Sequence, residues 1–210
     1  AEARKRFKEN YAQLRNAQKS SRGAPIYSLL VNRPFGRVLA AVAHRLGMTP
    51  DQVTMISALF TFTGIASIAV LPPSGPMAIG TALALMIGYA LDAADGQLAR
   101  LRGGGSLTGE WLDHVIDSFK IATLHLAVLI SMYRFFNLPP MWLLVPITFG
   151  AVYVIHFFGM LLTDLLTRNA ALRAGVEPGV GGTEGSSTLM ALLKLPTDYG
   201  VLSLSFLLLS

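Results

Sequence analysis

Long apolar runs dominate this sequence from residue 53 onward. A helix rises about 1.5 Å per residue and the hydrocarbon core of a bilayer is about 30 Å thick, so runs of roughly 20 residues can cross it. Such runs cover residues 53–71, 77–98, 109–135 and 141–166, and a further one begins after Pro196. With 52% hydrophobic and 14% charged residues, the chain has the composition of an integral membrane protein. We therefore predict an all-α, polytopic bundle of transmembrane helices.

Four aspartates lie at the border of the second and third apolar runs. A charged side chain costs roughly 2.5–3.5 kcal/mol at the centre of a membrane helix, so these carboxylates need a compensating partner. Asp92 and Asp95 are spaced i,i+3, and Asp113 and Asp117 are spaced i,i+4, so each pair shares one helical face. The Gly-rich stretch 101–108 is short enough to fold the next helix back antiparallel. The four carboxylates are thus expected to converge.

Convergent carboxylates in a chain without cysteine indicate a hard divalent cation. The sequence has no Cys, which excludes disulfides, thiolate metal sites and Cys nucleophiles. Oxygen ligands are those that Mg²⁺ and Mn²⁺ prefer. We expect Mg²⁺ or Mn²⁺ here, as one ion or as two.

The spacing of these residues is also similar to a known signature. It resembles the motif of the CDP-alcohol phosphotransferases at all eight specified positions: Asp92-x2-Asp95-Gly96-x2-Ala99-Arg100-x8-Gly109-x3-Asp113-x3-Asp117. These are integral-membrane enzymes that make phospholipids by displacing CMP from a CDP-linked substrate. With the hydrophobic pattern around the motif, the resemblance extends from about Thr49 to the end of the sequence.

The resemblance implies a role for each motif position. Asp92, Asp95 and Asp113 would hold the metal, and Asp117 would be the general base, with metal ligation as a further role. The other four positions would bind the nucleotide and its phosphates: Gly96, Ala99, Arg100 and Gly109. The resemblance also implies a homodimer and a pattern of six spans, the last of them truncated here.

Two substrate assignments share this chemistry. In the first, which we expect, CDP-diacylglycerol donates a lipid phosphate to a small polar alcohol such as inositol phosphate, glycerol phosphate or serine. In the second, a CDP-linked polar head group is donated to a lipid alcohol, as in the choline and ethanolamine phosphotransferases, whose Asp-His pair Asp113-His114 resembles. A remote alternative is a divalent-cation transporter, but no acidic residues continue a path through the other spans.

Residues 1–48 differ from the catalytic transmembrane domain expected over 49–210. Ten of the seventeen Lys and Arg residues lie in the first 45 positions, which suits an anionic lipid surface. No basic–aromatic RNA-binding motif accompanies them, so we expect no nucleic-acid partner. Apolar residues recur at mostly helical spacing over 26–46, which predicts an amphipathic helix in the membrane interface, bent at Pro34 and Gly36.

Local signals mark the start of the first span and its orientation. Thr49, Pro50 and Gln52 predict a capping box with proline at the first helical position. Placing the N-terminus in the cytoplasm leaves only Arg134 outside among the loop charges, so the aspartates would face the cytoplasm.

Several polar residues have two interpretations each. Glu110 either caps its helix start or joins the site, and His114 either assists proton transfer or is an interfacial histidine. Asp164 and Arg168 are spaced to pair. Four basic residues either bind a phosphorylated head group or face lipid phosphates: Lys120, Arg168, Arg173 and Lys194.

Overall fold

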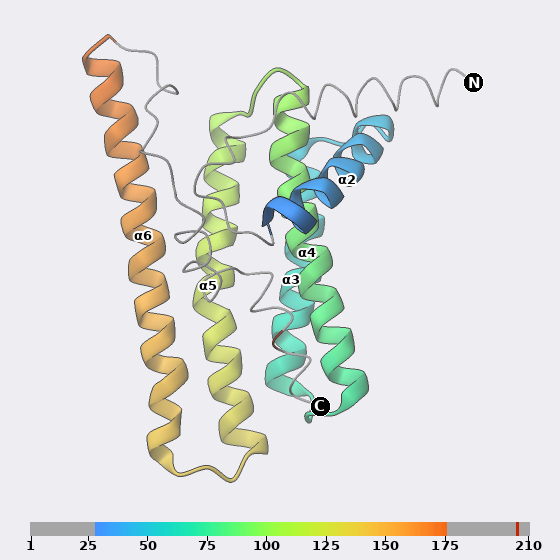
Figure 1. The fold of residues 1–210 in the computed structure, drawn as a ribbon, viewed down its shortest axis with the longest axis vertical. Helices are drawn as coiled ribbons and strands as arrows, with labels where there is room; N and C mark the ends of the chain where they lie inside the picture. The colour runs from blue at the N-terminus through green and yellow to red at the C-terminus, as the bar shows by residue number, and fades with distance from the viewer. Residues whose placement is uncertain (1–27, 176–204, 206–210) are drawn as a thin grey trace.

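The computed structural model describes residues 28–175 and residue 205, and every regular element among them is helical (Figure 1). The elements are η1 (Ser28–Asn32), α2 (Arg33–Arg45), α3 (Pro50–Val70), α4 (Gly75–Leu101), α5 (Leu107–Phe135), η2 (Pro140–Leu143) and α6 (Leu144–Arg173). The predicted all-α class is confirmed. The basic segment before residue 28 and the apolar run after Pro196 lie outside the described residues, except for residue 205.

Four described segments are long and apolar enough to cross a membrane: α3, α4, α5 and η2 with α6. They run alternately up and down in Figure 1, which confirms the polytopic bundle. The helices extend past the ends of the apolar runs. Thus α4 continues to Leu101 and α6 to Arg173, close to Gly103 and Gly175, which have positive φ angles of 95° and 69°. Glycine conformation, rather than the loss of hydrophobicity, marks where these helices end.

The start of α3 follows the predicted capping box. The Thr49 hydroxyl accepts a hydrogen bond from the Gln52 amide, and the Gln52 side chain accepts one from the Thr49 amide. Pro50 occupies the first helical position, where its missing N–H costs nothing.

The amphipathic segment is observed as α2, but the expected bend at Pro34 and Gly36 is not what these residues provide. Pro34 lies in the first turn of the helix, where proline is tolerated. Gly36 is buried, and a Cβ added there would lie 3.1 Å from the Cβ of Ala93 and 3.1 Å from Nε2 of Gln97. The glycine therefore lets α2 pack closely against α4.

Small residues bring α3 and α4 together over much of their length. The Ser57 hydroxyl donates to the Gly88 carbonyl at 2.8 Å, and a Cβ added at Gly88 would lie 2.2 Å from Oγ1 of Thr61. Gly64 packs in the same way against Leu85. Gly80, in contrast, has no described neighbour within 4 Å of an added Cβ. The predicted small-residue stripe of α4 is therefore a packing surface only in part.

The arrangement of α4 and α5 leaves a polar seam between them. Both helices pack against α3 but hardly touch each other, and α6 packs only against α5 (Figure 1). Gly103 and Gly104 make the connecting turn with φ angles of 95° and 130°, and Ser106 caps α5 by accepting a hydrogen bond from the Gly109 amide at 2.9 Å. The two halves of the aspartate motif therefore face each other across this seam.

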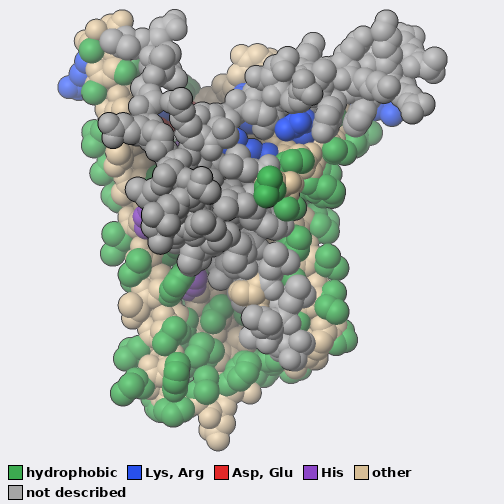
Figure 2. Space-filling model, in the orientation of Figure 1, with side chains coloured by type: hydrophobic (Ala, Val, Ile, Leu, Met, Phe, Trp, Pro, Cys, Tyr) green, Lys and Arg blue, Asp and Glu red, His purple; other side chains and the backbone are tan. Residues whose placement is uncertain are grey.

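The surface fits a membrane setting. In Figure 2, hydrophobic side chains cover the visible sides of the bundle, whereas the visible Lys and Arg side chains gather at the end where α2 lies and α6 finishes. Along α6, large apolar side chains such as Ile155 and Leu166 are exposed.

Candidate metal and phosphate site

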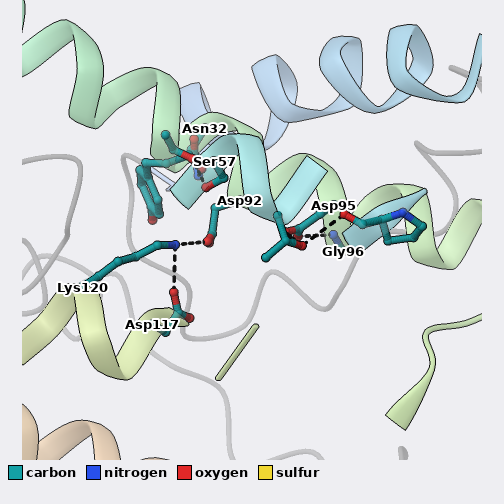
Figure 3. A network of polar contacts seen from close by, with 11 residues as sticks. Asn32, Ser57, Asp92, Asp95, Gly96, Asp117 and Lys120 are labelled. Atoms are coloured by element: carbon teal, nitrogen blue, oxygen red, sulfur yellow. Dashed lines mark hydrogen bonds and ion pairs between the residues drawn. The ribbon is translucent and has the colours of Figure 1, made fainter. Parts of the chain in front are cut away.

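Asp95 on α4 is the most deeply buried of the four aspartates and is held by two hydrogen bonds. The Thr54 hydroxyl on α3 donates to Oδ2 of Asp95 at 2.5 Å, and the Gly96 amide donates to Oδ1 at 2.5 Å (Figure 3). The side chain is 6% exposed. These bonds fix the Asp95 carboxylate before any ligand arrives.

Three of the four predicted aspartates form one close cluster. Asp92 and Asp95 from α4 and Asp113 from α5 place carboxylate oxygens within 4.8 Å of one another. No other group of three or more metal-type ligands occurs in the described part of the chain. The donor set is entirely carboxylate oxygen, which fits a hard divalent cation.

Asp117 stands apart from this cluster because a lysine lies between it and Asp92. Lys120 Nζ donates to Oδ1 of Asp92 and, at 3.0 Å, to Oδ1 of Asp117, as Figure 3 shows. The lysine is 6% exposed. The expected convergence of four carboxylates is thus a cluster of three, with the fourth linked through an ammonium group.

A cavity of about 240 Å³ opens beside the three clustered carboxylates. Its lining includes the guanidinium-bearing residues Arg33 of α2 and Arg100 of α4 together with Gly96. Two hydrogen bonds place the start of α2 there: Asn32 Nδ2 donates to the Tyr89 carbonyl at 3.2 Å, and Gln97 Nε2 donates to the Arg33 carbonyl at 3.2 Å. The cavity thus combines carboxylates on one side with positive charge on the other.

Desolvation lowers the pKa of the Arg33 guanidinium from its ordinary value, and the nearby Tyr89 opposes this shift. Arginine remains protonated at physiological pH even so. Arg33 therefore offers a permanent charge to an anion in the cavity.

The four positions expected to bind nucleotide are placed differently from one another. Gly96 and Arg100 line the cavity, whereas Ala99 and Gly109 are not among its lining residues. A Cβ added at Gly109 would lie 2.9 Å from a carboxylate oxygen of Asp51, so this glycine admits the first turn of α3 against the start of α5.

The remaining polar residues of α5 and α6 form a second, more exposed group. Arg168 Nη1 donates to Glu110 Oε1 at 2.7 Å and Nη2 lies 2.6 Å from Asp164, which confirms the predicted pair of Asp164 and Arg168. His114 Nε2 lies 3.8 Å from Glu110. Glu110 is therefore engaged with α6 and lies outside the carboxylate cluster.

Three contributors to the site had no assigned role in the sequence motif. Thr54 supports Asp95, Lys120 joins two aspartates, and Arg33 lines the cavity. Lys120 carried a signal, since it follows Asp117 by three residues and so shares its helical face. Thr54 and Arg33 reach the site only through helix packing.

The fold and site define an integral membrane protein with a buried carboxylate cluster between two antiparallel spans. The family model for CDP-alcohol phosphatidyltransferase matches residues 47–210. The chain therefore belongs to the CDP-alcohol phosphatidyltransferase family, as the motif indicated.

Individual relatives are matched over shorter segments. The chain is 38% identical over 86 residues to phosphatidylinositol phosphate synthase of Mycobacterium marinum, covering 40% of this chain and 35% of that protein. It is 36% identical over 94 residues to archaetidylinositol phosphate synthase of Pyrococcus horikoshii, covering 45% and 47%. The matches thus span less than half of either relative.

A solved structure is similar over a longer stretch. The crystal structure of Mycobacterium tuberculosis phosphatidylinositol phosphate synthase with CDP-DAG bound is 24% identical, with a TM-score of 0.41 and 85% of each chain covered.

Proposed function

We propose that this protein transfers a lipid phosphate from CDP-diacylglycerol to a small polar alcohol and releases CMP. The observation that carries the proposal is the cluster of Asp92, Asp95 and Asp113, assembled from two helices beside an arginine-lined cavity. Buried carboxylates in a membrane protein are costly and mark functional sites. Family membership supports the reaction type.

The three clustered carboxylates suit Mg²⁺ or Mn²⁺, because they offer only oxygen and lie close enough to share one ion. Such an ion, when bound, would neutralise the charge on the pyrophosphate and on the leaving CMP. The Thr54 and Gly96 hydrogen bonds keep Asp95 in place for this purpose.

The cavity is the proposed site for the phosphates of the donor. Arg33 and Arg100 supply guanidinium groups, which match phosphate geometry through paired N–H donors. Gly96 also lines the cavity, and its lack of a side chain keeps that wall close to the backbone. For Ala99 and Gly109 the proposed nucleotide-binding role has the family motif as its support.

Asp117 is the proposed general base. The acceptor hydroxyl oxygen forms a bond to the phosphorus that bears the alcohol moiety, the bond from that phosphorus to the CMP oxygen breaks, and the hydroxyl proton moves to Asp117. The carboxylate lies outside the tight cluster and is 29% exposed, which leaves it accessible to an acceptor.

The identity of the acceptor is proposed from the relatives. Both relatives are named as synthases of inositol phosphate lipids, which favours inositol phosphate over glycerol phosphate or serine. The alternative of a head-group transfer to a lipid alcohol was suggested by Asp113-His114. His114 lies 3.8 Å from Glu110, which draws it toward α6.

The proposed orientation places the aspartate site in the cytoplasm. Arg33, Arg100 and Arg168 lie on elements that meet at one end of the bundle, whereas Arg134 is near the other end, where it donates to the Ala69 carbonyl at 2.9 Å. The excess of basic residues marks the cytoplasmic side. By resemblance to the family we also propose a homodimer, which cross-linking in membranes would test.

The direct test is a substrate panel with purified protein, Mg²⁺ or Mn²⁺ and CDP-diacylglycerol. Inositol phosphate, glycerol phosphate and serine are offered separately, and CMP release is measured. We expect release that depends on inositol phosphate and stops in excess EDTA. Release only with CDP-choline and diacylglycerol would favour the head-group alternative. Absence of CMP release with every pair, combined with metal uptake into vesicles, would favour a transporter.

A further inference from the structure

Lys120 occupies an unusual position for a lysine. It lies within the apolar helix α5, is 6% exposed, and its ammonium group donates to the carboxylates of Asp92 and Asp117 (Figure 3). Lysine in a membrane span is as costly as aspartate unless it is paired. No other lysine occurs in the range 28–175.

The lysine divides the aspartate motif into two parts that share Asp92. On one side Asp92, Asp95 and Asp113 bring carboxylate oxygens within 4.8 Å of one another. On the other side Asp92 and Asp117 both accept hydrogen bonds from the same ammonium nitrogen. A cation therefore already stands between Asp92 and Asp117.

We propose that Lys120 takes the place of a second metal ion, so that the site binds a single divalent cation. The inference rests on the proposed metal-binding function of the cluster. A second divalent ion between Asp92 and Asp117 would have to displace the ammonium group or lie beside it, and like charges at such short range repel strongly. Lys120 is thus a positioning residue that fixes the metal stoichiometry and directs Asp117 toward the acceptor.

A purely mechanical role for Lys120 is the competing explanation. The helices α4 and α5 hardly touch each other, and the Lys120–Asp92 ion pair spans the seam between them. A mechanical link would affect stability or activity when removed, but it would not change how many ions the protein binds. Metal stoichiometry therefore separates the two explanations.

The experiment counts Mn²⁺ bound to the purified full chain in detergent, by electron paramagnetic resonance of the free ion during titration. We expect one ion per wild-type chain and two in Lys120→Met, because the freed Asp92 and Asp117 carboxylates then form a second site. Lys120→Arg, which keeps the charge, should bind one. Lys120→Met combined with Asp117→Asn should return to one. Lys120→Gln serves as a second charge-removing variant if the methionine variant does not fold.

Each outcome has a distinct meaning. Two ions in the wild-type protein overturn the inference while leaving the proposed metal site intact. One ion in both Lys120→Met and Lys120→Gln also overturns it, and leaves the mechanical role. No Mn²⁺ binding by the wild-type chain contradicts the proposed metal site itself, and the inference with it.

Discussion

Thr54 and Asp95 connect α3 to α4 through a hydrogen bond of 2.5 Å between Oγ1 and Oδ2. Thr54 also donates to the Pro50 carbonyl in the preceding turn, at 3.1 Å. The hydroxyl thus ties a buried carboxylate of the candidate metal cluster to the first turn of α3. That turn is itself set by the Thr49 capping box.

Removal of the Thr54 hydroxyl should weaken the metal site. In Thr54→Val the shape of the side chain is kept but Asp95 loses a donor, and a hydrogen bond to a charged group contributes roughly 1.5–3 kcal/mol. We expect the Mn²⁺ affinity to fall roughly tenfold or more, since about 1.4 kcal/mol corresponds to a factor of ten. Titration with Mn²⁺ measures this.

The matched control is Thr63→Val on the same helix. Thr63 is exposed and its hydroxyl donates only to the Leu59 carbonyl, at 2.7 Å. Its removal should leave the affinity unchanged. Equal losses in both variants would show that the effect comes from α3 as a whole and not from Asp95.

Substitutions of the aspartates should separate metal binding from proton transfer. We expect Asp95→Asn to lose Mn²⁺ binding and CMP release together, because Asp95 belongs to the three-carboxylate cluster. Asp117→Asn should keep Mn²⁺ binding but lose turnover by about 10²–10⁴-fold, the usual cost of losing a general base. Titration with Mn²⁺ and single-turnover kinetics give the two readouts.

Asp164→Asn is the corresponding control, since Asp164 is exposed and pairs with Arg168 on α6. It should leave Mn²⁺ binding unchanged. Near-normal turnover in Asp117→Asn would exclude the base role and direct attention to His114.

The close contact of α3 and α4 predicts a difference in stability between two glycines of the same helix. A Cβ at Gly88 would lie 2.2 Å from Thr61 Oγ1 and 3.1 Å from the Thr61 amide nitrogen, so Gly88→Ala should be destabilising by about 1–3 kcal/mol, as expected for overpacking. Gly80→Ala meets no described atom within 4 Å and should be neutral or slightly stabilising, because alanine favours helix. Thermal unfolding in detergent compares them, and equal stability of the two variants would contradict the described packing.

The sequence was sufficient for those features that depend on local pattern. Hydrophobic run length predicted the spans, the Thr49 capping box was confirmed, and the helical spacing of Asp92 and Asp95 placed both on one face. The proximity of Asp113 followed from the short Gly-rich turn. These features involve neighbours in sequence or a single helix reversal.

Features that depend on packing between distant segments were not predictable in the same way. Gly36 was expected to bend α2 and instead lets it approach α4, because a glycine serves either purpose and only the neighbouring helix decides. The separation of Asp117 from the other aspartates depends on the side chain of Lys120, 28 positions from Asp92. Helical periodicity places Lys120 on the right face but does not say which carboxylates it joins.

The last prediction concerns orientation in the membrane. The basic residues at the end that holds the aspartates predict that this end is cytoplasmic. Because the chain has no cysteine, single cysteines can report on each side. We expect Arg102→Cys, in the exposed α4–α5 turn, to resist an impermeant thiol reagent in intact cells and to react after permeabilisation. Leu138→Cys, in the exposed turn before η2, should react in intact cells. The reverse pattern would place the aspartates outside, away from cytoplasmic CDP-linked donors, and would contradict the proposed function.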